Sequence, residues 1–247
     1  MCLRLPAPRA LSNVCRLHAA AMSRILTPPE DRNMPCKFEY ACFISYSHAN
    51  QNLVLGFMAQ FKTALAASLE PLVDLPIFFD QDRLQGGYLY NEALASALCQ
   101  SACMVAVYSP VYERRPYCGR EFEAMVRLET QRLALAGVTR GRGLIIPVVL
   151  RGFEDLPPRI KDERHAVDFS QFTLADTQIS RNREFVAKVD LIAHQIYGHC
   201  KALTPVEDAA CTDCNTFRLP DEVELTPWRP AAVPAAVPAW PPQFPNR

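Results

Sequence analysis

The sequence predicts an α/β protein whose central parallel sheet is covered by helices on both faces. Short apolar runs, typical of fully buried strands, alternate along the chain with longer stretches in which apolar residues recur at helical spacing. This alternation is typical of strand–helix–strand units, whose crossovers are right-handed. With 247 residues, the chain has room for one such domain and for extensions at its ends.

Five apolar segments are the expected strands of this sheet. They are residues 40–46, 75–79, 102–108, 144–150 and 166–169. The fourth segment contains Pro147, which has no backbone N–H to donate to a neighbouring strand. We therefore expect this strand to lie at an edge of the sheet or to contain a bulge.

Four amphipathic segments are the expected helices. They cover approximately residues 53–69, 91–100, 116–136 and 185–198. The apolar stripe of the first helix consists of Leu53, Phe57, Phe61, Leu65 and Leu69. Pro71 ends this helix, and Pro116 is well suited to the first position of the third.

The composition argues against several classes of function. Lysine plus arginine and aspartate plus glutamate each total 26, and this neutral balance argues against a nucleic-acid-binding protein. No apolar run reaches the length of a membrane span. Several of the ten cysteines, among them Cys42, Cys99 and Cys103, lie in apolar runs, where a thiol behaves as a small apolar group. We therefore expect reduced cysteines and a cytoplasmic location.

An ordered domain is expected over residues 37–200, between two flexible extensions. Residues 1–36 show no helical or strand period, and we interpret them as a flexible tail or an over-extended start before Met34, in preference to an Arg-rich targeting segment. Prolines accumulate in residues 201–247, which predicts an extended, polyproline-like tail. We interpret its aromatic residues as free side chains rather than docking anchors. They include Trp228, Trp240 and Phe244.

A carboxylate and an aromatic ring are expected together after the third strand. Glu121 follows Tyr117 by four residues, so helical spacing places both side chains on one face near the start of a helix. This helix follows the carboxyl end of a buried strand, the edge at which open α/β sheets bind ligands. The alternative is that Glu121 only complements the helix dipole and that Tyr117 only packs.

Other motifs of known chemistry are absent or incomplete. Cys211 and Cys214 form a C-x-x-C pair, but a structural zinc ion needs four ligands, and only the adjacent His199 and Cys200 are near in the sequence. We therefore expect no metal. The Walker motif, the G-x-G-x-x-G motif and the G-x-S-x-G elbow do not occur, so the common nucleotide-binding and hydrolase patterns do not apply.

Three motifs, in this order, resemble those of a Toll/interleukin receptor (TIR) domain of the bacterial type. They are Phe43-Ile44-Ser45-Tyr46-Ser47, the loop of residues 80–88 with its Gly-Gly pair, and Ser109 followed by Tyr117-Cys118-Gly119-Arg120-Glu121. The resemblance covers residues 38–197 and implies a flavodoxin-like fold with a five-stranded parallel sheet. One departure is Tyr117, because the family often has tryptophan there.

The resemblance implies that NAD+ is a substrate and that no bound cofactor is needed. Many members cleave the nicotinamide–ribose bond with a glutamate in the helix after the third strand, which here is Glu121. One carboxylate can suffice, because the ribose becomes cationic while nicotinamide leaves as a neutral molecule. The expected substrate-binding residues are Ser45, Tyr46, Ser47, Arg83, Tyr88, Ser109 and Tyr117.

The resemblance also implies products and partners. Water would capture the ribosyl centre to give ADP-ribose, and an adenine nitrogen would give a cyclic ADP-ribose-type signal of the kind used in bacterial antiphage immunity. Other TIR domains are expected partners through self-assembly, and a downstream effector would bind the product. Two alternatives remain open. One is a non-catalytic TIR scaffold, and the other is an enzyme similar to nucleoside deoxyribosyltransferases.

Overall fold

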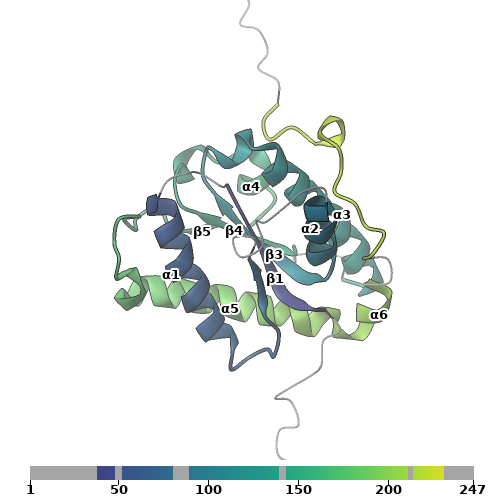
Figure 1. The fold of residues 1–247 in the computed structure, drawn as a ribbon, viewed down its shortest axis with the longest axis horizontal. Coiled ribbons are helices and arrows are strands. Elements are labelled where there is room, and N and C mark those ends of the chain that lie inside the picture. Colours follow the sequence, from purple (N-terminus) through teal and green to yellow (C-terminus); the bar gives the residue numbers. More distant parts are fainter. Residues whose placement is uncertain (1–37, 48–51, 80–88, 139–142, 211–213, 231–247) are drawn as a thin grey trace, which may run out of the picture. The chain divides into compact units, whose positions relative to one another are not determined.

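The computed structural model describes residues 38–47, 52–79, 89–138, 143–210 and 214–230. Its centre is one five-stranded sheet in which all neighbouring strands are parallel, as the sequence predicts (Figure 1). In spatial order the strands are β2 (Ile77–Phe79), β1 (Tyr40–Tyr46), β3 (Ser101–Tyr108), β4 (Ile145–Val149) and β5 (Val167–Asp168). This strand order is that of the flavodoxin-like fold.

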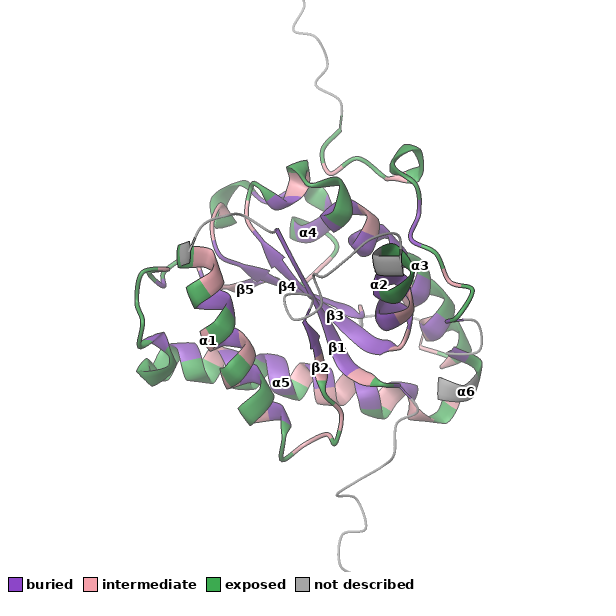
Figure 2. Ribbon diagram, in the orientation of Figure 1, coloured by how far each residue is buried: buried purple, intermediate pink, exposed green. Residues whose placement is uncertain are grey.

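Helices cover both faces of the sheet, as expected. On one face, α1 (Asn52–Leu69) packs beside α5 (Arg183–Leu203). On the other face lie α2 (Leu89–Cys99) and α3 (Pro116–Leu135). The strands are almost entirely buried between these layers (Figure 2). Within the described ranges, no helix is both long enough and apolar enough to cross a membrane.

The position of Pro147 corrects one prediction, because β4 lies between β3 and β5 and not at an edge. The Leu150 N–H donates to the Tyr108 carbonyl, whereas the Val149 carbonyl accepts from the Phe169 N–H. Alternate residues of β4 therefore bond to opposite neighbours, and the nitrogen of Pro147 faces the side of β5. The pairing with β5 begins only at the next residue, so the missing N–H of Pro147 precedes that ladder.

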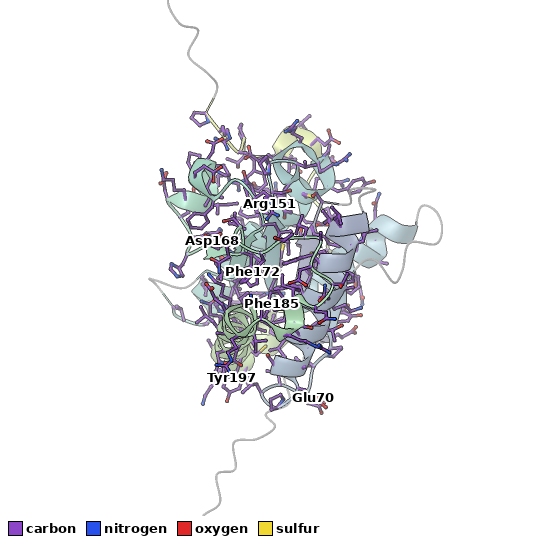
Figure 3. The ribbon with its side chains drawn as sticks, turned by 90° about the vertical axis from the view of Figure 1, so that its left-hand side faces the viewer. Glu70, Arg151, Asp168, Phe172, Phe185 and Tyr197 are labelled. Carbon is purple, nitrogen blue, oxygen red and sulfur yellow. A yellow bond between two sulfur atoms is a disulfide. The ribbon has the colours of Figure 1, made fainter. Side chains whose placement is uncertain are left out.

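An aromatic cluster fills the space between α1, α5 and the end of β5. The ring of Phe185 lies 6.0 Å from Phe57, 5.7 Å from Phe169 and 5.6 Å from Phe172. Figure 3 shows Phe185 and Phe172 in this layer. The predicted stripe of α1 is confirmed from Phe57 onward, but Leu53 is 54% exposed. Leu53 lies in the first turn of α1.

A disulfide between Cys99 and Cys214 corrects the prediction that the cysteines are reduced. It joins the end of α2 to the C-terminal part of the chain, 115 residues away, with Cα atoms 5.3 Å apart. The fold brings the two residues together, and no local spacing in the sequence signals such a pair. Among the described residues, the cysteines outside this disulfide are Cys42, Cys103, Cys118 and Cys200, and all four are buried.

The chain after α5 packs against the domain as far as residue 230. The helix α5 continues to Leu203 and is followed by η5 (Thr204–Val206) and α6 (Glu207–Ala210). Residues 214–230, which we call the C-terminal segment, then lie along α3 (Figure 1). The interpretation of Trp228 as a free aromatic is wrong, because its ring contacts Tyr112 and Phe122. Trp240, Phe244 and residues 1–36 lie outside the described residues.

Candidate functional site

The candidate site lies at the carboxyl ends of β1 and β3, where the direction of the strand order reverses. From β1 the chain passes to β2 on one side and then to β3 on the other, and open α/β sheets bind ligands at such a switch point. Ser45 is the next-to-last residue of β1. Tyr112 begins η2 (Tyr112–Arg114), the short 3-10 helix after β3, and Glu121 lies on α3.

Three side chains from these elements form a hydrogen-bonded chain. The Ser45 hydroxyl donates to the Glu121 Oε2 over 2.5 Å, and the Ser45 Oγ lies 2.7 Å from the Tyr112 hydroxyl. All three residues are buried, with exposed fractions of 1% for Ser45, 7% for Glu121 and 0% for Tyr112. Because a buried polar group needs a partner, the Glu121 carboxylate is oriented by β1 through Ser45.

Burial keeps the Tyr112 hydroxyl and the Cys118 thiol, both beside Glu121, protonated. The pKa of the Tyr112 hydroxyl is raised well above 10.0, first by burial and then by the charges of Cys118 and Glu121. Burial also raises the pKa of the Cys118 thiol well above 9.0, and Glu121 adds to this effect. Tyr112 therefore remains a hydrogen-bond donor, and Cys118 remains a thiol, at neutral pH.

The position of Glu121 in α3 excludes the dipole interpretation. The helix begins at Pro116 and has no acidic residue in its first turn. Glu121 is the sixth residue of the helix, and the dipole effect falls off within the first turn. Its carboxylate instead points inward to Ser45 on the neighbouring strand.

The family model of the TIR domain matches residues 42–182. The chain belongs to the TIR domain family. The matched range starts within β1 and ends just before α5, so it includes Ser45, Tyr112 and Glu121 but not the C-terminal segment. No curated protein matches the chain.

Two other predicted residues of the TIR site lie at the end of β1. Ser47 follows the strand and is 6% exposed. Tyr46 is buried, and its ring stacks on Phe79 of β2 with centroids 5.1 Å apart. Arg83 and Tyr88, the two expected residues from the loop of residues 80–88, lie outside the described residues.

Ser109 and Tyr117 lie on either side of η2. The carbonyl of Ser109 accepts from the Tyr112 N–H over 2.8 Å, so this residue starts the turn that carries Tyr112. The side chain of Tyr117 is 49% exposed, and the Arg120 guanidinium lies 5.9 Å from its ring. The structure thus does not bring Tyr117 together with the buried Glu121. Four residues advance a helix by slightly more than one turn, so the two directions differ by about 40°.

Tyr112 is the residue of the candidate site that the sequence analysis did not predict. It lies in a charged loop between Val111 and Glu113, where one aromatic residue carries little information. Its position in the sequence could have indicated a role. Tyr112 lies between a buried strand and the helix that carries Glu121, and turns at such positions place side chains at the edge of the sheet.

The described residues offer no metal centre at this site or elsewhere. Among them, no three side chains of His, Cys, Asp or Glu are grouped so that they could hold a metal ion. Cys214 of the C-x-x-C pair is bonded to Cys99 instead. Glu121 does not line any of three cavities found between described residues. One of these cavities is lined by Arg164, His194 and neighbouring residues.

Proposed function

We propose that this TIR domain is an NAD+ glycohydrolase or ADP-ribosyl cyclase in which Glu121 is the catalytic residue. The observation that carries the proposal is the orientation of a buried carboxylate, by Ser45, at the switch point of the sheet. Parallel sheets bind nucleotides at this point, and the family includes enzymes that cleave NAD+. The proposed substrate is therefore a dinucleotide with a cationic nicotinamide.

The chemistry requires one negative charge beside the ribose. As the nicotinamide–ribose bond breaks, the ribose becomes an oxocarbenium-like cation, and a carboxylate fixed beforehand stabilises it. Nicotinamide takes up the bonding electron pair and leaves as a neutral molecule, so no general acid is needed. Ser45 holds the Oε2 of Glu121 and so fixes the direction of the carboxylate that would face the sugar.

The remaining predicted residues would hold the substrate. Ser47 and Ser109 could donate to phosphate or ribose oxygens, and Arg83 could pair with the pyrophosphate. Tyr46, Tyr88 and Tyr117 would present aromatic faces to the cationic nicotinamide ring. Tyr117 is half exposed, so its face is accessible, whereas Tyr46 is buried and stacked on Phe79 and would present its face only after a change of rotamer.

The cellular role follows from the same proposal. Capture of the ribosyl centre by water gives ADP-ribose, and capture by an adenine nitrogen gives a cyclic product, which would act on a downstream effector. We propose a bacterial-type protein that acts in antiphage immunity in the cytoplasm and is activated when TIR domains assemble. The disulfide removes part of the basis for the cytoplasmic location, which rested on reduced cysteines.

The test is NAD+ consumption by the purified full-length chain, with products identified by mass spectrometry. We expect Glu121→Gln to lower kcat by about 100-fold to 1,000-fold, the size of effect that follows loss of one preorganised electrostatic group. A rate per molecule that rises with protein concentration would support activation by assembly. Cleavage by Glu121→Gln at the wild-type rate would remove Glu121 from the mechanism.

Glu123→Gln is the matched control. Glu123 lies on the same helix and is 8% exposed, but its carboxylate pairs with Arg159 at 2.8 Å and not with the site. We expect this variant to lower the thermal stability and to lower kcat far less than Glu121→Gln does, because Arg159 is linked to Tyr112 only through Trp228. Equal losses of kcat in both variants would show that any buried charge in α3 matters, and the proposal would lose its main support.

A non-catalytic scaffold is the second candidate, and the burial of Glu121 favours it. An exposed fraction of 7% is small for a group that must touch a substrate. A scaffold would form TIR–TIR contacts and leave NAD+ intact at every protein concentration. The two candidates are therefore separated by the same assay, carried out on the assembled protein.

A further inference from the structure

The C-terminal segment is fastened to the TIR domain at several points along α3. At its start, Cys214 is bonded to Cys99 of α2. Farther along, the Arg120 guanidinium donates to the Pro220 carbonyl over 2.7 Å, and the Leu225 side chain lies against Gly119, where an added Cβ would be only 3.1 Å from it. The segment therefore covers the part of α3 that carries Glu121, although it lies outside the matched family range.

Trp228 of this segment packs directly on Tyr112. Their ring centroids are 5.7 Å apart in an edge-to-face arrangement, and Trp228 also contacts Phe122 at 4.7 Å. The Arg159 guanidinium lies 5.4 Å from the Trp228 ring and donates to the Thr226 carbonyl, so it holds the tryptophan in place. Aromatic pairs of this geometry are favourable and directional.

Arg229, the residue after Trp228 in the segment, binds Glu113, the residue after Tyr112 in η2. The Arg229 guanidinium donates to both carboxylate oxygens of Glu113, each over 3.0 Å, and to Asp155 over 2.9 Å. The Tyr108 hydroxyl at the end of β3 also donates to Glu113. Two consecutive residues of the segment thus fix two consecutive residues of η2, which limits the movement of the Tyr112 ring.

Counting protons gives the Ser45–Tyr112 hydrogen bond a direction. An ionised Glu121 can only accept, so the single proton of the Ser45 hydroxyl goes to Glu121. The Ser45 oxygen must then accept from Tyr112, whose hydroxyl keeps its proton at neutral pH because it is buried. A hydroxyl that accepts one hydrogen bond is a stronger donor in the next.

We propose that Tyr112 is a positioning residue, which holds the Ser45 hydroxyl so that it donates to Glu121, and that the C-terminal segment keeps Tyr112 in place through Trp228 and Arg229. This inference rests on the proposed function for its kinetic consequence, but the hydrogen-bonded chain itself can be tested without any reaction. If Tyr112 served only for packing, a phenylalanine of the same shape would serve equally well.

The closing experiment measures the pKa of Glu121 by carbon-13 NMR of glutamate-labelled full-length protein, with Glu121→Gln to assign the signal. The titratable groups that interact with Glu121 include Tyr112 from η2 and Cys118 from α3 itself, and both stay protonated through this titration. We expect Tyr112→Phe to raise the pKa of Glu121 by about one unit, because Ser45 then stabilises the carboxylate less. Trp228→Ala should raise it less, and Trp228→Phe least of all.

The kinetic arm uses the same variants. We expect Tyr112→Phe to lower kcat by about tenfold with little change in KM, and to move the acid limb of the pH profile of kcat/KM upward. Tyr197→Phe is the matched control and should change neither quantity, because Tyr197 lies on α5, which covers the other face of the sheet from α3.

The outcomes separate the two proposals. An unchanged pKa of Glu121 in Tyr112→Phe would overturn the positioning role, whatever the wild type does to NAD+. A raised pKa of Glu121 in Tyr112→Phe, together with a wild type that leaves NAD+ intact, would support the positioning of Glu121 and overturn the proposed function. A loss of kcat in Tyr197→Phe equal to that in Tyr112→Phe would also overturn the positioning role.

Discussion

Under α1 and α5 the sheet is covered by aromatic rings, whereas under α3 the buried layer combines apolar side chains with charged ones. The first face contains Phe57, Phe61, Phe169 and Phe185, each at most 1% exposed. The second face buries four charged side chains. They are Glu121, Glu123, Arg132 and Arg159. The two faces have the same architecture, since each consists of two helices on the same strands.

The two faces differ in how far their buried side chains need specific hydrogen-bonding or ionic partners. Apolar rings need only to be removed from water, and any well-packed neighbour serves. Each buried charge instead needs a specific group. Glu123 has Arg159 at 2.8 Å, Arg132 donates to the Ser101 carbonyl over 2.7 Å, and Glu121 has Ser45. The α3 face therefore carries groups that can do chemistry, and the α1–α5 face carries the apolar stability of the fold.

Truncating a ring of the α1–α5 face should give the largest loss of stability. We expect Phe185→Ala to lower the free energy of unfolding by about 3–5 kcal/mol, because the cavity would be surrounded by other rings. Urea denaturation followed by circular dichroism measures this loss. The pKa of Glu121 in the remaining folded protein should not change.

Val186→Ala is the matched control for this substitution. Val186 is the next residue of α5 and is 44% exposed, so the same kind of truncation should lower stability by less than about 1 kcal/mol. Equal effects at both positions would contradict the view that the aromatic cluster stabilises this face.

Breaking the disulfide should lower the global stability and should have its largest local effect on the α3 face. The Cys99–Cys214 bond closes a loop of 115 residues, and loss of a disulfide commonly lowers stability by roughly 2–5 kcal/mol. We expect Cys214→Ser to have an effect in this range. Hydrogen exchange should become faster throughout by the loss of global stability, and the additional local increase should be largest in residues 214–230 and in η2 and smallest in α1 and α5.

A reductant provides the internal control for this prediction. It should lower the melting temperature of the wild type to that of Cys214→Ser and should have no further effect on the variant. An identical melting temperature of the oxidised and reduced wild type would show that the contacts of Trp228 and Arg229 hold the segment without the disulfide.

The sequence predicted the two faces unequally, for a physical reason. Strands and helices leave a period of apolar residues, and this period placed the β1 and β3 runs and most of the stripe of α1 correctly. The segment around Trp228 has no such period, because it is held by single contacts to α3 and η2. The prolines of this segment predicted a free tail. The surface of α3 and η2 that the segment contacts is formed only when the chain folds.

The site was predicted in part for the same reason. Glu121 and Ser45 lie in motifs that resemble those of the family, and the structure brings them together. Tyr112 belongs to no motif, and helical spacing placed Tyr117 beside Glu121 without showing that Tyr117 is exposed while Glu121 is buried. Hydrogen bonds between distant parts of the chain, such as Ser45 to Tyr112, leave no signal in one sequence.

The smallest expected effect is a loss of stability in alkaline solution that depends on Tyr112, on the α3 face. The folded-state pKa of Tyr112 is raised above the usual 10.0, so its contribution to stability is fully present below pH 10 and is lost as the pH rises toward the folded-state pKa. Cys118 behaves in the same way from about pH 9, since its usual pKa of 9.0 is also raised. From pH 10 to 11, Tyr112 should account for about 1 kcal/mol of the fall in unfolding free energy.

In Tyr112→Phe this part of the fall should disappear, while Tyr197→Phe should follow the wild type. If both variants lost stability alike over this range, Tyr112 would ionise as easily in the folded protein as in the unfolded chain, and it could not serve as a fixed donor to Ser45.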